Sequence, residues 1–303
     1  MKKKIIFFAF ATKDLSNSVK RLKTQALVSN FYDQIKILNN SDIDKRGNKI
    51  LSNFSKKRGY GYWFWKPYLI LKIFKNMNEG DILHYADIGC HINKNGYKKF
   101  NEYIKILNKD NKGILAFQYY PLKNKNRLEF PKRQEYKYTK ADLLNFFGFL
   151  KNKKIIESSQ FMAGNFFMKK NSFTISFLKD WLNIFEKNYE LVDDSPSKIK
   201  NRKDFIENRH DQSIFSLLCK KNKILALSAY ECDWSLILIV SENSLGSLLA
   251  YIFCIINNHV GIIIDSKTTE QNILKTFKNY QPNYIFLSKK TKSIFKKICS
   301  EEY

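Results

Sequence analysis

Residues 4–12 read KIIFFAFAT and residues 33–39 read DQIKILN, two apolar runs on either side of a longer mixed segment. The first run has the length and the continuous apolar character of a buried strand, and Ile35, Ile37 and Leu38 give the second run a similar character. Residues 14–30 between them predict a helix. A strand, a helix and a second strand in this order indicate a parallel sheet with crossover helices, so we expect an α/β fold.

This alternation continues along the chain. Further strands are expected near residues 82–86, 113–119 and 161–168, with helices near 96–107, 138–149 and 172–188. After Trp234 the sequence becomes poorer in aromatic residues and predicts a compact βαβαβ segment, with strands at 236–240, 260–265 and 284–287 and helices at 244–257 and 268–280. We therefore place a domain boundary near Asp233, with domains at 1–233 and 234–303.

The chain carries a formal net charge of +25, which favours contact with anions such as nucleic acid, anionic lipid or phosphorylated small molecules. Most of this charge is lysine spread along the chain, so a solvated surface and a functional anion-binding surface both remain open. No homeodomain, zinc-finger or RNA-recognition signature accompanies the charge, so we expect no nucleic-acid partner.

The cysteines and the apolar runs bear on the location of the protein. The five cysteines are widely spaced and form no Cys-x-x-Cys pair, which disfavours a zinc site and fits reduced thiols in the cytoplasm. Residues 5–10 are too short for a signal peptide, and residues 245–256 are too short to span a bilayer. We expect a cytoplasmic protein without a transmembrane helix, with peripheral contact at the inner membrane face through its basic surface.

Asp87 ends the third expected strand. In open α/β sheets, ligands bind beyond the carboxyl ends of the strands. A carboxylate at this place can hold a divalent ion or a ribose hydroxyl. The alternative is an aspartate that only begins the turn before Gly89.

Residues 209–212 read RHDQ and precede an amphipathic helix. Asp211 is a candidate base or acceptor of a sugar hydroxyl, and His210 is a candidate metal ligand or phosphate donor. Capping of the helix is the alternative.

Residues 58–67 read RGYGYWFWKP and combine cations with aromatic rings. Arg58 and Lys66 are candidates to meet phosphates, and Trp63 and Trp65 to stack on a base or a sugar, because side chains at spacing two share one face of an extended strand. Core packing of at least one tryptophan is the alternative. In the later pair Gly164-Asn165, the missing side chain of glycine would let the backbone approach a sugar closely, or the pair is only a turn.

Four blocks together resemble a family of bacterial glycosyltransferases from polysaccharide gene clusters (capsule and lipopolysaccharide). They are GYGYWFWKP at 59–67, GDILHYADIGC at 80–90, QFMAGN at 160–165 and RHDQS at 209–213. The resemblance extends over residues 1 to about 230. It implies a GT-A-type, Rossmann-like mixed sheet flanked by helices, and a hexosyltransferase that moves a sugar from a nucleotide diphosphate donor to a glycan or lipid-linked acceptor.

The resemblance also implies roles for single residues. Asp87 matches the first acid of the metal-binding Asp-x-Asp element, but Gly89 replaces the second acid. Dependence on Mn²⁺ or Mg²⁺ is therefore open, with His210 or His91 as a substitute ligand. Asp211-Gln212 matches an acid–glutamine element on the acceptor side, with Asp211 as the expected catalytic carboxylate. The expected sets are Arg58, Tyr62, Lys66, Asp87 and Gly89 for the donor, Trp65, Gly164, Asn165 and Gln212 for the acceptor, and Asp87 with His210 for a metal.

Residues 236–288 resemble something else, the opening of the adenylate-forming acyl-ligases of the ANL superfamily. The phosphate loop and the later motifs of those enzymes are absent, so we expect no adenylation by this chain. Two alternatives to a transferase stay open at this point: a non-catalytic scaffold that binds glycan or nucleotide, and a fragment of a bifunctional transferase and acyl-ligase.

Overall fold

The computed structural model describes residues 3–54, 58–120, 133–232, 236–256, 260–269, 271–273, 275–276 and 284–287. The chain separates into two compact units, residues 1–120 with 131–229, and residues 121–130 with 230–303. The expected α/β class is confirmed in both units. The boundary expected near Asp233 falls outside the described residues and stays a prediction.

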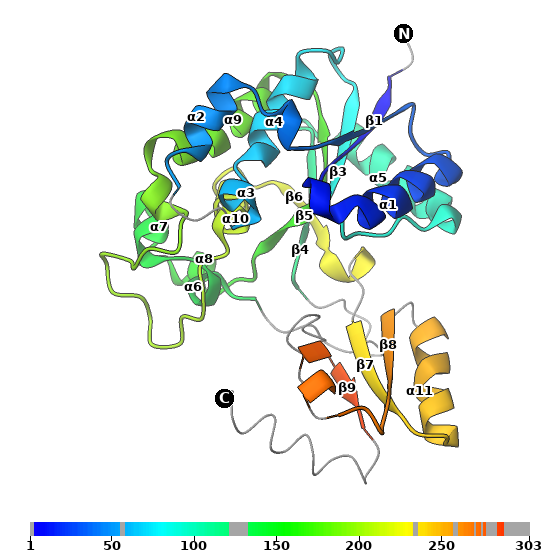
Figure 1. Ribbon diagram of the computed structural model, residues 1–303. Coiled ribbons are helices and arrows are strands. Elements are labelled where there is room, and N and C mark those ends of the chain that lie inside the picture. The colour runs from blue at the N-terminus through cyan, green and yellow to red at the C-terminus, as the bar shows by residue number, and fades with distance from the viewer. Residues whose placement is uncertain are drawn as a thin grey trace. The chain divides into compact units, whose positions relative to one another are not determined.

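The first unit alternates strands and helices along the chain (Figure 1). Its strands are β1 (Ile5–Phe10), β2 (Gln34–Leu38), β3 (Ile82–Ala86), β4 (Ile114–Gln118), β5 (Phe161–Lys169) and β6 (Leu225–Ser228). Its helices are α1 (Ser16–Ser29), α2 (Lys45–Leu51), α3 (Gly59–Tyr62), α4 (Trp65–Phe74), α5 (Tyr97–Lys109), α6 (Glu135–Tyr138), α7 (Ala141–Phe146), α8 (Lys153–Ile156), α9 (Ser172–Lys187) and α10 (His210–Lys221). Short 3₁₀ turns occur at Lys13–Leu15, Asn40–Asp42, Lys94–Gly96, Tyr189–Leu191 and Ala229–Glu231.

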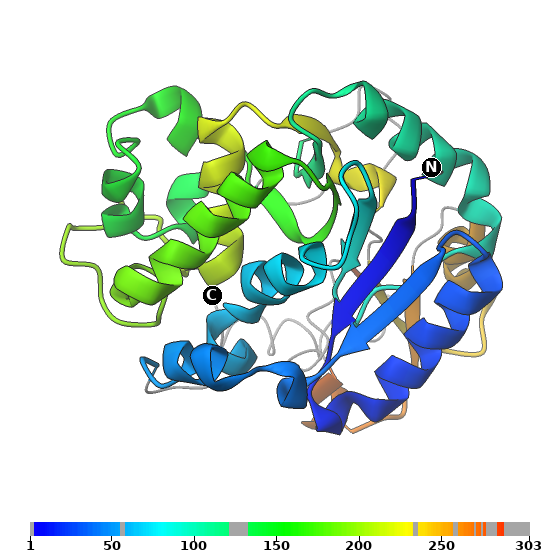
Figure 2. The same cartoon turned by 90° about the horizontal axis from the view of Figure 1, so that it is seen from above.

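These strands form one six-stranded sheet in the order β2-β1-β3-β5-β4-β6. Every neighbouring pair is parallel except the two that β5 makes with β3 and β4. Seen from above, the blue helix α1 and the blue-green helix α5 lie on one side of the strands, and the green and yellow-green helices α9 and α10 lie on the other (Figure 2). The mixed sheet flanked by helices is therefore confirmed. Strand β6 was not predicted, because four residues carry too little periodicity to be recognised.

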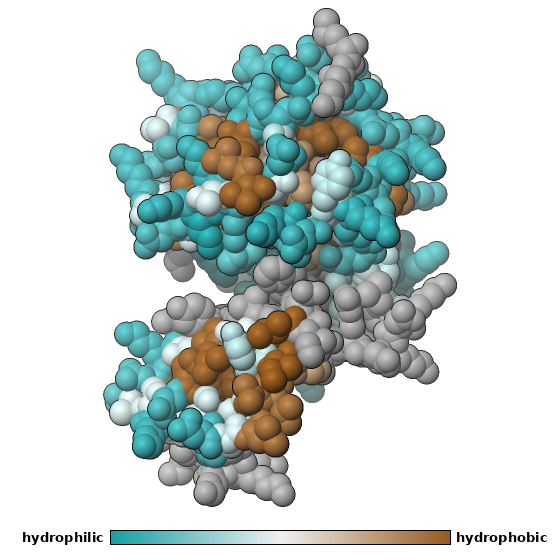
Figure 3. All heavy atoms as spheres, turned by 90° about the vertical axis from the view of Figure 1, so that its right-hand side faces the viewer, coloured by the Kyte–Doolittle hydropathy of each residue, from teal (hydrophilic) through white to brown (hydrophobic). Residues whose placement is uncertain are grey.

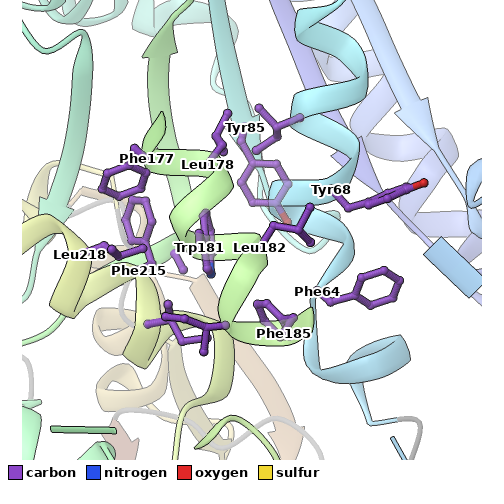
Figure 4. Close-up of a cluster of buried hydrophobic side chains, with 14 of the residues drawn as sticks. Phe64, Tyr68, Tyr85, Phe177, Leu178, Trp181, Leu182, Phe185, Phe215 and Leu218 are labelled. Carbon is purple, nitrogen blue, oxygen red and sulfur yellow. The ribbon is translucent and has the colours of Figure 1, made fainter. Parts of the chain in front are cut away.

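The core between the sheet and helices α4, α9 and α10 is largely aromatic (Figure 4). The ring of Phe215 on α10 lies 4.9 Å from that of Phe166 on β5 and 5.0 Å from that of Trp181 on α9. Tyr85 on β3 continues this row, with its ring 5.0 Å from Phe166. Rings of this size bury much apolar area at low entropic cost, so they hold α10 firmly against the end of the sheet.

Strand β5 bulges where it passes between β3 and β4. Ala116 of β4 pairs with Phe166, but its neighbour Phe117 pairs with Met162, so residues 163–165 have no partner in β4. Bulges are frequent next to active sites because they redirect backbone groups and side chains. This bulge leaves the carbonyl groups of Ala163 and Gly164 for other partners.

The second unit holds a parallel sheet in the order β8-β7-β9, and it follows the expected βαβ pattern where it is described. Its elements are β7 (Leu236–Ser241), α11 (Leu245–Ile256), β8 (Val260–Asp265) and β9 (Tyr284–Phe286). The helix expected at 268–280 is described only in part. Ala250 and Cys254 of α11 pack on Ile237 and Ile239 of β7.

The other side of α11 is apolar and exposed. Figure 3 shows hydrophobic side chains gathered over this unit, and those exposed on α11 are Leu245, Leu248, Leu249, Tyr251, Ile252, Phe253 and Ile255. At 12 residues, α11 is shorter than a bilayer-spanning helix. Within the described part of the chain, the structure contains no helix with the length and apolar character that crossing a membrane requires.

Candidate functional site

The candidate site lies at the carboxyl ends of the parallel strands of the first unit. Strand β3 ends at Ala86 and is followed by Asp87, and β4 ends at Gln118 on the same edge, because β3 and β4 are both antiparallel to β5. Helix α10 begins there with His210 and Asp211, against β5. This is the edge at which α/β sheets bind ligands.

A buried lysine joins two carboxylates at this edge. Lys66 Nζ lies 2.7 Å from Asp211 Oδ2 and 3.3 Å from Asp87 Oδ1, and it donates to the carbonyl of Ala163 in the β5 bulge at 3.2 Å. The side chains of Lys66 and Asp211 are 3% and 6% exposed, whereas that of Asp87 is 43% exposed. Of the two acids, Asp87 is therefore the one that a ligand can reach.

The protonation of this cluster follows from burial and charge. Burial raises the pKa of Asp211 to about 6, although the charge of Lys66 acts in the opposite direction. Burial acts to lower the pKa of Lys66, but the two carboxylates outweigh it and leave that pKa above its usual value. Lys66 is therefore a permanent cation at neutral pH, and Asp211 stays ionised there because of it.

Neighbouring groups fix the direction of the Asp87 carboxylate. The Tyr85 hydroxyl donates to Asp87 Oδ1, the oxygen that also faces Lys66, whereas no described residue donates a hydrogen bond to Oδ2. The Asp87 amide donates to the Gly164 carbonyl at 2.8 Å. Arg21 of α1 donates to the carbonyls of Ile88 and Cys90 at 3.0 and 2.7 Å, and so holds the loop that follows Asp87.

Gly164 leaves the space that Asp87 occupies. A Cβ at this position would lie 2.8 Å from Asp87 Oδ2, closer than real Cβ contacts. Gly164→Ala should therefore displace the Asp87 carboxylate, and a misplacement of about 1 Å at a reacting group lowers turnover by about 10²-fold. Turnover and melting temperature would be compared with those of Gly96→Ala, whose Cβ would meet only Asn93, at 3.9 Å. Wild-type turnover in Gly164→Ala would contradict this role.

Lys66 follows a left-handed turn. Residues 59–63 all have positive φ, from 54° to 83°, and three of them (Tyr60, Tyr62 and Trp63) are not glycine. Each non-glycine residue in this conformation costs about 1–2 kcal/mol. Strain of this kind persists only where the surroundings enforce it, and it clusters at functional sites. The expectation that Trp63 and Trp65 share one face of an extended strand is therefore wrong, because the chain turns here.

The turn depends on Gly61. This residue has a φ of +83°, and an added Cβ would lie 2.6 Å from Leu51 Cδ1 and 2.9 Å from Phe64 Cδ1. Gly148 is a matched control, because its φ is +72° and nothing lies within 4 Å of an added Cβ. Gly148→Ala should lose about 1–2 kcal/mol of unfolding free energy from strain alone. Gly61→Ala should lose about 1–3 kcal/mol more from overpacking. Urea unfolding measures the loss of unfolding free energy in each variant. Equal losses in Gly61→Ala and Gly148→Ala would contradict the overpacking expected at Gly61.

A second polar cluster forms around Asp194. Tyr62 donates to Asp194 Oδ2 at 3.0 Å, Arg58 lies 3.4 Å from Oδ1, and His210 Nε2 lies 3.4 Å from the same oxygen. Burial lowers the pKa of His210, so the ring is neutral at pH 7 and its Nδ1–H donates to the carbonyl of Val192 at 2.6 Å. Arg58 and Tyr62, expected to meet the donor, are thus engaged with Asp194.

The structure also shows the surroundings of four other residues that were expected to bind the donor or the acceptor. Trp65 is 4% exposed and stacks on Phe10 at 4.1 Å, so its ring belongs to the core. Asn165 Oδ1 lies 2.8 Å from Nε2 of buried His84. The Gln212 amide donates to Gln160 at 2.9 Å. Gly89 is exposed, and a Cβ there would meet nothing within 4 Å.

The donor set does not fit a metal ion held by Asp87 and His210. Asp87 Oδ1 already faces the ammonium of Lys66, and His210 is turned toward Asp194 and Val192. The substitute ligand His91 contacts Gln25, with Nδ1 3.2 Å from its amide nitrogen. Among the described residues, no three His, Cys, Asp or Glu side chains gather to hold a metal. The expectation of Mn²⁺ or Mg²⁺ stays a prediction.

Sequence reasoning missed several residues at this edge. Tyr85 had a readable signal, because residues two apart in a strand share a face, and this places it beside Asp87. No signal in the sequence indicates Arg21, Arg133 or Asp194, because these residues reach the site only through tertiary contacts. Buried Glu135 was also missed. It pairs with Lys220 at 2.8 Å and accepts hydrogen bonds that the side chains of Thr139, Gln160 and Ser216 donate, so it ties α6 and the residue before β5 to α10.

A large groove lies elsewhere in the first unit. This groove of about 910 Å³ runs between α2, α4 and α9 and is lined by both acids and lysines, among them Asp44, Lys72, Lys179 and Glu186. None of the residues of the Lys66 cluster lines it. Volume alone does not indicate chemistry, so the strained turn and the buried charges make the strand ends the stronger candidate.

Comparison with known proteins finds little. No family model matches the chain, and no curated protein matches it. Among solved structures, the chain is similar to the apo form of the glycosyltransferase GlyE from Streptococcus pneumoniae TIGR4, with a TM-score of 0.35 and 13% identity over 76% of this chain. The match spans 46% of the GlyE chain. A likeness of this size identifies no activity, so function must come from the site itself.

Proposed function

We propose that the first unit is a glycosyltransferase that moves a sugar from a nucleotide diphosphate donor to a glycan acceptor. The observation that carries this proposal is the half-exposed Asp87 carboxylate at the carboxyl edge of the sheet, which the buried Lys66 and Tyr85 hold in one orientation. A carboxylate positioned in this way suits both binding of a sugar hydroxyl and acceptance of its proton.

The proposed reaction assigns different roles to the two acids. Asp87 Oδ2 accepts the proton of the acceptor hydroxyl as that oxygen forms a bond to the anomeric carbon. The bond from the anomeric carbon to the phosphate oxygen breaks, and the nucleoside diphosphate leaves with the electron pair. Asp211 is too buried to meet the acceptor, so it acts as a positioning residue that holds Lys66 against Asp87. This assignment gives Asp87 the catalytic role first expected for Asp211.

The wider role rests on the sequence. The four blocks that resemble bacterial polysaccharide glycosyltransferases support a role in surface polysaccharide synthesis, with a glycan or a lipid-linked acceptor. The net charge of +25 suits phosphate-bearing substrates and contact with an anionic membrane surface.

The test is a panel of nucleotide diphosphates and their sugars. A ligand that binds the folded protein raises its melting temperature, so one nucleotide class should shift it. The matching nucleotide sugar should then release its nucleoside diphosphate when acceptor glycans are added. Binding without turnover would favour the non-catalytic scaffold, and absence of binding by every nucleotide would refute the proposal.

A further inference from the structure

Arg209 lies just before α10, two residues from Asp211, in a setting that holds its guanidinium still. Its Cζ lies 4.6 Å from the centre of the Tyr138 ring, and its side chain is 27% exposed. Glu207 is the carboxylate paired with it, at 3.2 Å from Nε, and Glu207 also lies 3.8 Å from Arg58. One acid is thus shared between two arginines.

A second arginine, Arg133, is joined to the segment of Arg209 through Gln160. The Gln160 backbone amide donates to the Arg133 carbonyl at 2.7 Å, and the side chain of Gln212, three residues after Arg209, donates to Gln160 Oε1 at 2.9 Å. Arg133 donates to the Tyr119 hydroxyl at 2.8 Å, and its Cζ lies 4.3 Å from the centre of the same ring. Tyr119 directly follows β4, so Arg133 lies at the carboxyl edge of the sheet. Burial lowers the pKa of Arg209, and the charge of Arg133 lowers it further, as expected for two neighbouring cations. Of the described carboxylates, none forms an ion pair with Arg133.

A third arginine also stacks on a tyrosine, but its positive charge is balanced by nearby acids. Arg202 lies over Tyr136 at 4.1 Å, but it is 49% exposed and has two acids within ion-pair distance, Glu157 at 3.8 Å and Asp204 at 4.0 Å. Its charge is already compensated. Arg133 and Arg209 together carry two positive charges. The carboxylate that pairs with Arg209 is Glu207, which Arg209 shares with Arg58.

We propose that Arg133 and Arg209 form an anion site that takes the phosphate groups of the nucleotide donor. This inference rests on the proposed function, because it places the diphosphate at the same carboxyl edge of the sheet as the carboxylate that acts on the sugar. Planar guanidinium groups bind phosphate oxygens in pairs, and aromatic stacking orients them before the ligand arrives. As the bond to the sugar breaks, the two cations stabilise the charge that develops on the leaving diphosphate.

The experiment measures binding of inorganic pyrophosphate and of nucleoside diphosphates by calorimetry. Arg209→Gln and Arg133→Gln should each weaken binding about 10- to 100-fold, the effect of losing a hydrogen bond to a charged group. Arg202→Gln, the matched control, should bind as the wild type does. Arg209→Lys keeps the charge but loses the planar fork, so its loss should be smaller than that of Arg209→Gln. Circular dichroism and melting curves identify any variant that fails to fold. If Arg209→Gln fails to fold, Arg133→Gln and Arg209→Lys still test the site.

The outcomes separate this inference from the proposed function. If folded Arg133→Gln and Arg209→Gln bind nucleoside diphosphates as tightly as the wild type, the anion site is refuted while transfer can stand. If citrate binds through both arginines and pyrophosphate does not, the site is one for carboxylates and the inference is again refuted. If pyrophosphate requires both arginines but no nucleotide sugar binds or reacts, the anion site stands and the proposed function fails.

Discussion

We expect Asp87→Asn to lower the rate of the proposed sugar transfer by about 10²–10⁴-fold, the contribution of a general base, and to leave the fold intact. Asparagine keeps an oxygen that accepts from Lys66 and Tyr85, but it cannot take a proton. The altered side chain is 43% exposed in the wild type, so the melting temperature should change little. Binding of the nucleoside diphosphate should also remain. Initial rates with saturating donor and acceptor, together with melting curves, measure these effects.

Asp44 supplies a matched control. It is 49% exposed, accepts a hydrogen bond from the Tyr68 hydroxyl and lies 3.5 Å from Lys72, so it shares the tyrosine and lysine partners of Asp87. It belongs to the cap of α2 instead of the strand ends, and asparagine caps helices as well as aspartate does. Asp44→Asn should transfer sugar at the wild-type rate. Equal rates in Asp87→Asn and Asp44→Asn would remove Asp87 from the reaction.

Lys66→Met has the largest expected effect on stability. The change leaves Asp211 as an uncompensated buried charge, which costs about 3–5 kcal/mol of unfolding free energy. Methionine fills a similar volume, so little of this loss comes from a cavity. Urea unfolding at pH 8 measures the loss, which should far exceed that of an exposed lysine such as Lys72→Met, whose side chain is 46% exposed.

The loss should shrink as the pH falls. The pKa of Asp211 is raised to about 6 in the folded protein from 3.8, and removal of Lys66 raises it further. The folded state of Lys66→Met therefore holds a proton that the unfolded chain releases above its own pKa, so protonation favours folding. Stability should rise from pH 8 to pH 5 relative to Lys66→Met/Asp211→Asn, which lacks this titration. A loss that is the same at both pH values would contradict the buried charge.

Much of the first unit follows from local pattern. Strands β1, β2, β3, β4, β5 and helices α1, α5, α9 lie within a few residues of their expected positions, because each has a continuous or periodic apolar run. The conformation of residues 59–67 cannot be predicted from local pattern, because a left-handed turn is unfavourable for non-glycine residues. The turn is stabilised by the burial of Tyr62, Phe64 and Trp65. A sequence read by propensity alone expects the cheaper extended form.

The sequence by itself determined the α/β order of the elements and the place of Asp87 at the end of a strand, since both depend on apolar runs and on where they stop. Only the tertiary structure decided that Lys66 joins Asp87 to Asp211, that Trp65 belongs to the core, and that Gln160 joins the segments of Arg133 and Arg209. Burial and Coulomb energy depend on distances between segments far apart in the chain. Those distances are set by how the strands pair and by which face each helix covers.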